Sequence, residues 1–221
     1  MNGFSANLDW AGIAGACLDT LAMLGGSLLL TILFGLPLGI LLFLTSPGQM
    51  WASRFGHGLL GIIVNFLRSV PFIILLILMI PLTVVLVGTS LGVAGAIPPL
   101  VAGAAPFFAR LVETALREVD RATIEAVQAM GATTRDLVLR ALLPEALPGI
   151  VAGATVTAIT LVSFTAMAGV VGAGGLGDLA IRFGYQRFQT DVMVVTVAFL
   201  VLLVQGLQFF GDRLVVRVSH R

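Results

Sequence analysis

The segment from Thr20 to Leu44 has the sequence TLAMLGGSLLLTILFGLPLGILLFL and carries no charged residue. A helix needs about 20 mostly apolar residues to cross the roughly 30 Å hydrocarbon core of a membrane. Pro37 lies inside this segment, and proline is tolerated in such helices because neighbouring groups satisfy the carbonyl that it leaves free. The segment is therefore predicted to be a membrane-spanning helix.

The composition of the whole chain points the same way. Of its 221 residues, 58% are hydrophobic and only 10% are charged, and the mean hydropathy is +1.09. Soluble domains contain about 25% charged residues, so this chain has too little polar surface to cover a water-exposed domain. A soluble enzyme, a disordered chain and a nucleic-acid binder, which needs a basic stripe, are excluded. We expect an all-α integral membrane protein.

The reactive side chains are few. All 12 basic residues are Arg, which excludes a phosphate-binding P-loop or a Schiff base in this chain. Cys17 is the single cysteine and has no partner for an internal disulfide. His57 and His220 have no Cys or carboxylate at ligand spacing, so neither a metal site nor Ser–His chemistry is expected. No nucleophile–base pair supports an intramembrane enzyme.

Five spans are predicted in one membrane domain that covers residues 1–221. Their approximate bounds are 20–44, 58–80, 91–109, 146–171 and 192–211. An alternative for the second span places an interfacial helix over 51–66 and the crossing at 71–87.

The distribution of Arg predicts the orientation of these spans, because cytoplasmic loops carry an excess of basic residues. Two Arg fall on one side of the membrane, Arg182 and Arg187. The opposite side holds nine: Arg54, Arg110, Arg117, Arg121, Arg135, Arg140, Arg213, Arg217 and Arg221. The N-terminus is therefore expected outside, and the segment 110–145 and the C-terminus in the cytoplasm.

The segment 110–145 is the one long polar stretch, and its first half predicts a short helix. Asp120 is a suitable N-cap for a helix that runs to Met130. Gly131 follows at the place where a left-handed residue ends a helix. A solvated connector is the alternative to a docking role, but so many helix signals favour a structured element.

A second short helix is predicted directly after Gly131. Thr133 is followed by Asp136 three residues later, which resembles a capping box. Pro144 is expected to end this second helix.

No Asp or Glu falls in any of the five predicted spans. Proton-driven carriers need a titrating group inside the membrane, so a proton-coupled carrier is disfavoured. Energy for uphill transport is expected to come from an external motor subunit, for which the polar segment would be the docking element.

The same segment resembles the EAA loop of ABC importer permeases. The resemblance lies in Glu125-Ala126-Val127-Gln128-Ala129-Met130-Gly131 followed by Leu143-Pro144, with departures only at Val127 and Ala141. In that family this loop contains the coupling helix, which sits in a cleft of the ATPase subunit. The resemblance implies that the ATPase is contacted by Glu125, Ala126, Ala129, Met130, Gly131, Ala132, Leu143 and Pro144.

Other segments are similar to the methionine branch of this family, namely Phe66–Leu75, Gly88–Ser90, Gly103–Phe107, Leu142–Ile150 and Gly172–Gly177. The resemblance implies the five-span type I importer fold in the bacterial inner membrane. It also implies a second copy of the chain, two ATP-binding subunits that carry ATP and Mg, and an external substrate-binding lipoprotein. The chain itself is then a transport subunit without cofactor or ATPase site, and D- and L-methionine are the expected substrates. Another small amino acid or hydrophobic solute, or an ATP-independent carrier, are the alternatives.

Candidate residues for the translocation path lie on the fourth span. Ser163, Phe164, Met167 and Val171 are spaced i, i+1, i+4 and i+8, which places them along one region of a helix. Packing inside the protein is the alternative for such a stripe. Arg68, inside the second span, is either a functional charge or a residue near the cytoplasmic headgroups.

Glycine patterns raise two further questions. Residues 172–177 match G-x-G-x-x-G but follow a membrane span rather than a strand, so a dinucleotide site is excluded. A flexible turn where the fourth span re-enters or caps the path, or a plain external turn, remain open. Small residues at four-residue spacing allow close helix packing, as at Gly35 and Gly39. Packing within one chain is the default interpretation of such spacing, but the run of Gly149, Gly153 and Thr157 also suggests an interface, including one between two copies.

Overall fold

The structure is a computed structural model that describes residues 9–219. His220 and Arg221, which entered the predictions above, lie outside the described residues. The described chain is helical throughout, with two π-helical segments, η1 and η2. In order, the elements are α1 (Trp10–Thr45), α2 (Arg54–Ser69), α3 (Phe72–Leu78), α4 (Ile80–Val87), α5 (Gly92–Arg117), α6 (Arg121–Ala129), α7 (Thr134–Asp136), η1 (Leu137–Leu142), α8 (Leu143–Gly169), α9 (Gly175–Leu179), η2 (Ala180–Tyr185) and α10 (Thr190–Val218).

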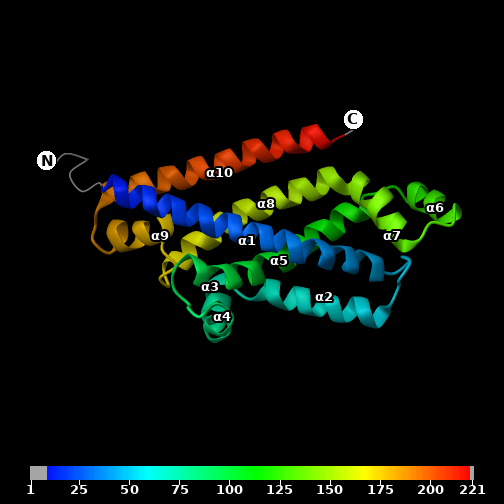
Figure 1. Ribbon diagram of the computed structural model, residues 1–221, viewed down its shortest axis with the longest axis horizontal. Coiled ribbons are helices and arrows are strands. Elements are labelled where there is room, and N and C mark those ends of the chain that lie inside the picture. Colours follow the sequence, from blue (N-terminus) through cyan, green and yellow to red (C-terminus); the bar gives the residue numbers. More distant parts are fainter. Residues whose placement is uncertain (1–8, 220–221) are drawn as a thin grey trace.

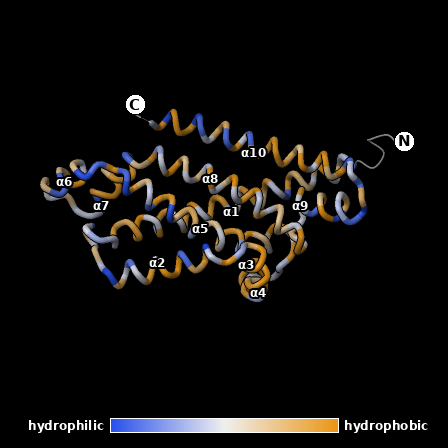
Figure 2. The backbone as a smooth tube through the Cα atoms, turned by 180° about the vertical axis from the view of Figure 1, so that it is seen from behind, coloured by the Kyte–Doolittle hydropathy of each residue, from blue (hydrophilic) through white to orange (hydrophobic). Residues whose placement is uncertain are grey.

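The long helices run side by side along the molecule, as Figure 1 shows. Four of them are long and apolar enough to cross a membrane, and the bent pair α2 and α3 forms a fifth candidate. The chain therefore passes along the bundle five times, and its two ends lie at opposite ends of the molecule. Figure 2 shows hydrophobic segments through the middle of the bundle and hydrophilic ones near α6 and between α9 and α10. The predicted all-α membrane fold is confirmed.

The second span differs from the predicted straight helix over 58–80. α2 stops at Ser69, Val70 is extended, and the chain bends by 102° before α3 begins. Proline disfavours helical geometry in the residue before it, so Pro71 fixes the break at this point. The alternative with an interfacial helix over 51–66 is also wrong, because α2 lies along the bundle and α4 runs across it (Figure 1).

Each of the other helices is longer than its predicted span. α1 begins ten residues earlier, where the Asp9 side chain accepts a hydrogen bond of 3.1 Å from the Ala11 backbone N–H. α5 continues past residue 109 to Arg117, and α10 runs on to Val218. The predicted spans contain no Asp or Glu, but the complete helices do, since Asp19 lies in α1 and Glu113 in α5. Hydropathy marks the part of a helix that crosses lipid, and these helices extend beyond that part.

Pro144 does not end the second short helix, contrary to the prediction. The helix continues without a break from Thr134 through η1 into α8 and reaches Gly169. A proline ring in a regular α-helix collides with the carbonyl four residues earlier. The wider π-helical turn over 137–142 lies immediately before Pro144 and gives that ring room.

Glycines bring the helices close together within the chain. A Cβ on Gly39 of α1 would lie 2.6 Å from the Ala109 carbonyl oxygen of α5. Gly149 of α8 faces Ala115, with a hypothetical Cβ 2.9 Å from the Ala115 Cβ, and Gly153 faces Leu111, both residues of α5. The run at 149–157 therefore packs α8 onto α5 in the same chain, and the suggestion of an interface between copies is wrong for these glycines.

The glycine-rich turn after α8 is tightly packed. Gly172, Gly174 and Gly175 have positive φ angles of 91°, 78° and 81°, which L side chains rarely adopt. The chain then turns back, and the Leu176 backbone N–H donates to the Thr20 hydroxyl of α1 at 2.9 Å. The segment after the turn therefore packs against α1 within the same chain, and the flexibility expected there does not match this packing.

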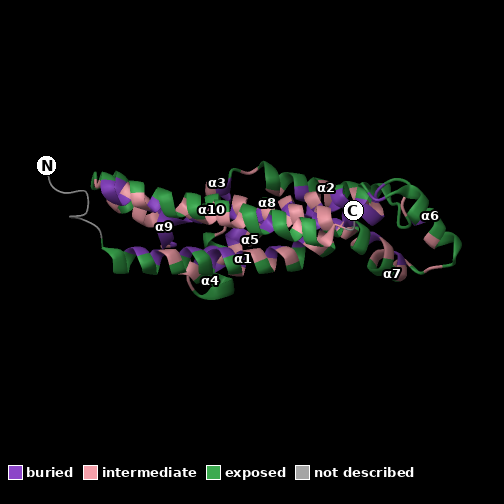
Figure 3. Cartoon of the chain, turned by 90° about the horizontal axis from the view of Figure 1, so that it is seen from above, coloured by how far each residue is buried: buried purple, intermediate pink, exposed green. Residues whose placement is uncertain are grey.

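The buried side chains form two main groups along the bundle. One lies near α6 and includes Phe43, Phe108, Leu116 and Leu142. The other lies toward α9 and includes Met23, Leu100, Leu161 and Ala168. Figure 3 shows that the outer faces of the helices, α10 and α6 among them, stay exposed. Lipid and partner subunits are what such apolar outer faces contact in a membrane protein.

Candidate coupling site and translocation path

The helix α6 has the caps that the sequence predicts. The Asp120 carboxylate accepts a hydrogen bond from the Ala122 backbone N–H at 3.0 Å. At the other end Gly131 has φ of 76°, and its N–H donates to the Gln128 carbonyl at 2.9 Å. A left-handed glycine of this kind reverses the chain directly after the helix, which brings the next segment back toward the bundle.

The predicted capping box is also present. The Thr133 hydroxyl accepts from the Asp136 N–H at 3.2 Å and donates to the Asp136 carboxylate at 2.6 Å. Arg140 lies 3.4 Å from the same carboxylate, one turn further on. These contacts start the long helix that continues as α8 and reaches Gly169.

One face of α6 is anchored and the other is open. Ile124 is buried and packs with Leu137 and Leu142 in the core near this end of the bundle. Of the eight predicted docking residues, Glu125, Ala126, Ala129, Met130 and Gly131 are exposed, and Met130 is 78% exposed. α6 also lies at the extreme end of the molecule (Figure 1). The arrangement leaves one face of this short helix accessible while the other face packs on the bundle.

The remaining three predicted docking residues are placed differently. Ala132 and Leu143 are half-buried, and Leu143 packs against the core. Pro144 is exposed and lines a cavity of about 400 Å³ together with Glu118 and Glu145. Leu143 therefore packs against the core of the bundle, whereas Pro144 lies on an accessible surface.

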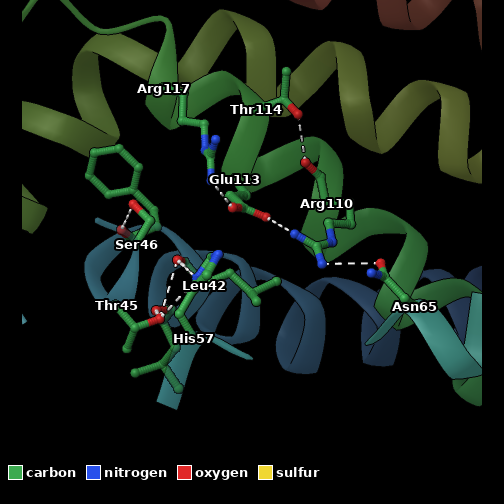
Figure 4. A network of polar contacts seen from close by, with 11 residues as sticks. Leu42, Thr45, Ser46, His57, Asn65, Arg110, Glu113, Thr114 and Arg117 are labelled. Carbon is green, nitrogen blue, oxygen red and sulfur yellow. Dashed lines mark hydrogen bonds and ion pairs between the residues drawn. The ribbon is translucent and has the colours of Figure 1, made fainter. Parts of the chain in front are cut away.

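A buried ionic cluster lies in α5, close to this end, and sequence reasoning missed it. Glu113 is 3% exposed and accepts from Arg110 at 2.7 Å and from Arg117 at 2.6 Å (Figure 4). Arg110 also donates to the Asn65 side chain of α2 at 3.1 Å. The cluster thus links α5 to α2. The spacing Arg-x-x-Glu-x-x-x-Arg over 110–117 is the signal that predicts it, once the helix is known to continue there.

A second polar group in Figure 4 joins α1 to α2. His57 Nδ1 lies 3.2 Å from the Leu42 carbonyl oxygen and 3.5 Å from the Thr45 hydroxyl. The Ser46 hydroxyl donates to the Phe43 carbonyl at 2.7 Å. Within residues 9–219 no group of three His, Cys, Asp or Glu side chains is suitable for a metal ion. His57 therefore has a structural place at the connection between the two helices.

The predicted path residues do not share one surface. Ser163 and Met167 line an apolar groove of about 540 Å³ between α8 and α10. Arg68 and Phe164 line a separate pocket of about 160 Å³, in which Phe164 stacks on Phe72 with ring centroids 4.1 Å apart. Val171 borders a third, very small cavity. The helical spacing was correct, but the residues point to different neighbours around α8.

Arg68 is exposed at the end of α2, and its guanidinium lies 5.9 Å from the centre of the Phe107 ring. Within the part of the chain that the structure describes, it forms no ion pair. A cation over an aromatic face is favourable but weak where solvent reaches it. Arg68 is therefore free to meet a further group.

The model of the family described as binding-protein-dependent transport system inner membrane component matches residues 35–221. The chain belongs to this family. It is accordingly an inner-membrane component of a transport system. The matched region contains both residues 110–145, the coupling segment, and every predicted path residue.

Relatives with assigned names are similar over most of their length. The probable D-methionine transport system permease protein MetI of Vibrio cholerae is 50% identical over 85% of this chain and 83% of its own length. The methionine import system permease protein MetP of Bacillus subtilis is 49% identical over 78% of both chains. MetI of Escherichia coli strain K12 is 54% identical over 68% of this chain and 70% of its own.

Solved structures confirm the fold. A chain of the MetNI methionine ABC transporter in an inward-facing conformation superposes with a TM-score of 0.94 at 49% identity, covering 95% of this chain and 97% of that one. An amino acid ABC transporter solved with histidines gives a TM-score of 0.80 at 15% identity, over 98% of this chain and 99% of that one. The latter likeness concerns the fold alone.

Proposed function

We propose that this chain is the permease subunit of an ATP-driven importer and forms the path by which methionine crosses the bacterial inner membrane. The observation that carries the proposal is the 49% identity and TM-score of 0.94 with the MetNI methionine transporter. The exposed, doubly capped α6 supports it independently, because a permease without its own ATPase site needs a surface on which an ATPase docks.

The working assembly that we propose contains two copies of this chain, two ATP-binding subunits and an external substrate-binding lipoprotein. ATP and Mg are bound by the ATP-binding subunits, which contact the exposed residues of α6. The N-terminus lies outside and the C-terminus in the cytoplasm. The clustering of Arg at the α6 end of the bundle favours this orientation.

A proton-driven carrier is the rival that Glu113 raises, since this carboxylate is buried within a long helix. Both of its oxygens, however, are occupied by guanidinium groups, Oε2 by Arg110 and Oε1 by Arg117. A proton relay needs a carboxylate that exchanges protons with the path. Glu113 is therefore better suited to joining helices than to carrying protons.

Uptake of labelled methionine into proteoliposomes distinguishes these functions. The vesicles contain this chain with its ATP-binding subunits, and the binding protein is added outside. We expect accumulation that requires both ATP and the binding protein, with competition by unlabelled D- and L-methionine but not by lysine. Accumulation driven by a proton gradient without ATP would favour the carrier, and equal competition by an unrelated amino acid would refute the substrate.

We further propose that Ser163 and Met167 border the translocation path and that Arg68, Phe164 and Val171 lie near it. Met167 is 45% exposed in the groove between α8 and α10. Met167→Arg introduces a charge at membrane depth, which costs about 3 kcal/mol or more, and is expected to abolish uptake in an assembled complex. Met167→Leu is the matched control with nearly unchanged volume and retains uptake. Uptake by an assembled Met167→Arg complex would place the path elsewhere.

A further inference from the structure

An apolar groove lies between α1, α8 and α10, in the half of the bundle nearest the coupling segment. Its volume is about 740 Å³, larger than that of the groove with Met167. Aliphatic and aromatic side chains from all three helices form its walls, among them Leu28, Ile32, Ile150, Ala154, Leu207 and Phe210. A cavity of this size and lining, open at the side of a membrane protein, suits a hydrocarbon chain better than water.

The groove lies beside a part of α10 that the rest of the bundle covers only loosely. Gly211 of α10 lies so close to α8 that a Cβ on this glycine would collide with the Thr155 side chain, and both residues line the groove. Elsewhere α10 is only loosely covered. Of the residues in its most apolar stretch, 11% are buried, against 33% to 50% in the corresponding stretches of the other three long helices. Phe210 and Leu214 on its rim are 71% and 49% exposed.

Two cations line the groove together with these apolar groups. Arg213 and Arg217 lie one helical turn apart near the end of α10. Neither forms an ion pair within residues 9–219, and the neighbouring Asp212 accepts a hydrogen bond from Gln208 instead, at 2.7 Å. Arg213 lies over the Phe209 ring at 4.2 Å. Both guanidiniums keep N–H donors for an anion.

The length of the groove matches one leaflet of a membrane. On α8 its lining residues carry no charge and extend over 147–158, and at 1.5 Å per residue this is about 16 Å. Half of the roughly 30 Å hydrocarbon core is about 15 Å. A phospholipid whose headgroup meets the two Arg would thus place an acyl chain along the apolar walls.

We propose that this groove binds a phospholipid with an anionic headgroup, with Arg213 and Arg217 on the phosphate and an acyl chain between α1, α8 and α10. Basic pockets between membrane helices favour anionic lipids through such contacts. The bound lipid fills the gap beside α10 and holds this helix against the bundle. This proposal goes beyond the transported substrate and does not depend on it.

Native mass spectrometry of the full-length chain in its purified complex tests the headgroup. Phosphatidylglycerol and phosphatidylcholine with identical acyl chains are added in turn. We expect at least fivefold more bound phosphatidylglycerol, a preference that R213Q/R217Q abolishes and R213K/R217K keeps. Arg187 also stacks on a phenylalanine, at 4.5 Å from Phe183, so R187Q is the matched control and retains the preference. Equal binding of both lipids, or equal loss in R187Q, would refute the anionic site.

If R213Q/R217Q fails to assemble, two measurements on proteins that keep both Arg test whether a lipid occupies the groove. A phosphatidylglycerol with a photoactivatable group in its acyl chain should label wild-type peptides that contain residues 147–158 or 207–214. In a second arm, L214C in a C17S background is oxidised in membranes. We expect no disulfide between copies. Labelling confined to other helices would overturn the proposal, and so would an efficient disulfide, since it would show a second copy in the groove.

Discussion

Glu113 illustrates how a single side chain holds two helices in register. Its carboxylate is buried, and each oxygen accepts from one guanidinium, while Arg110 reaches across to Asn65 of α2. A buried charge that loses its partners is strongly destabilising, even though the intact pair contributes little net stability. The cluster therefore joins α5 to α2, and removal of one member costs more than the intact cluster contributes.

Glu113→Gln is expected to lower the free energy of unfolding by about 2 kcal/mol, mainly because it leaves the Arg110 guanidinium, whose side chain is 23% exposed, without its carboxylate. The readout is the thermal unfolding midpoint of the purified protein in detergent. Arg117→Gln is the control within the cluster, since the Arg117 side chain is 52% exposed and a solvated partner is worth about 1 kcal/mol or less. Equal midpoints for wild type and Glu113→Gln would show that the cluster does not stabilise the fold.

Gly39 offers a second test at the scale of one residue. A methyl group there would lie 2.6 Å from both the Ala109 carbonyl oxygen and the Val112 Cβ, whereas Gly25 in the same helix has no atom within 4 Å. Gly39→Ala should destabilise by about 2 kcal/mol through overpacking. Gly25→Ala should be neutral or stabilising by up to about 1 kcal/mol, because alanine is the better helix former.

Thermal unfolding of both alanine variants, in the same detergent, measures the difference. A drop of equal size in the two variants would mean that flexibility in α1, rather than close packing on α5, decides these glycines. A drop only in Gly39→Ala would confirm that the small residues at 35 and 39 serve contact between helices of one chain.

Local features were predictable from the sequence, and distant ones were not. The caps at Asp120 and Thr133 and the left-handed Gly131 depend on neighbours a few residues away, and all three are present. The pairing of Glu113 was not predicted because the span was ended at the first charge, near Arg110. The divided surroundings of Ser163 and Phe164 were not predictable either, since periodicity cannot say which helix faces each side of α8.

At the scale of elements, Pro71 and Pro144 have different effects on the helix around them. The residue type alone does not predict which effect occurs. Pro71 follows an extended residue and separates α2 from α3 by a bend of 102°. Pro144 instead lies in a continuous helix, because the preceding π-helical turn accommodates its ring. The sequence predicted the reverse, with Pro71 inside the second span and Pro144 at the end of a helix. The consequence is one continuous helix from Thr134 through η1 into α8.

The turn at Gly131 sets how α6 is placed relative to that continuous helix. The residue has φ of 76° and no atom within 4 Å of a hypothetical Cβ, so a substitution there is disfavoured by backbone geometry and not by space. Gly131→Val should displace α6, because a β-branched residue avoids positive φ. We expect intact membrane insertion, and a loss of ATPase co-purification and of substrate-stimulated ATP hydrolysis.

Gly131→Asn is the matched control, since asparagine tolerates the left-handed region and should keep most of the activity. Glu125→Ala, an exposed residue on α6, should reduce docking only mildly, by about 1 kcal/mol or less. Normal docking and normal hydrolysis in Gly131→Val would contradict the role of this turn in coupling.

At the scale of the whole molecule, the five passes sort the charges to the two ends of the bundle. The connection between α1 and α2, the coupling segment and the end of α10 lie at one end, and the connection between α9 and α10 lies at the other. Of the Arg residues assigned to the first end, all but Arg221 lie within the described residues. The fold thus groups in space what the sequence placed in separate connections, and an orientation follows from the rule that basic loops face the cytoplasm.

The orientation is testable by labelling single cysteines in a C17S background. Cys17 itself is a poor reporter, because it lies half-buried within α1. Gln186 is exposed in the connection between α9 and α10, and Ala52 is exposed between α1 and α2. An impermeant maleimide should label Q186C in intact cells and label A52C only after the membrane is opened. Since both sites are exposed, a difference between them reports the side of the membrane and not burial. Labelling of A52C in intact cells, with Q186C protected, would invert the orientation and place α6 where no cytoplasmic ATPase can reach it.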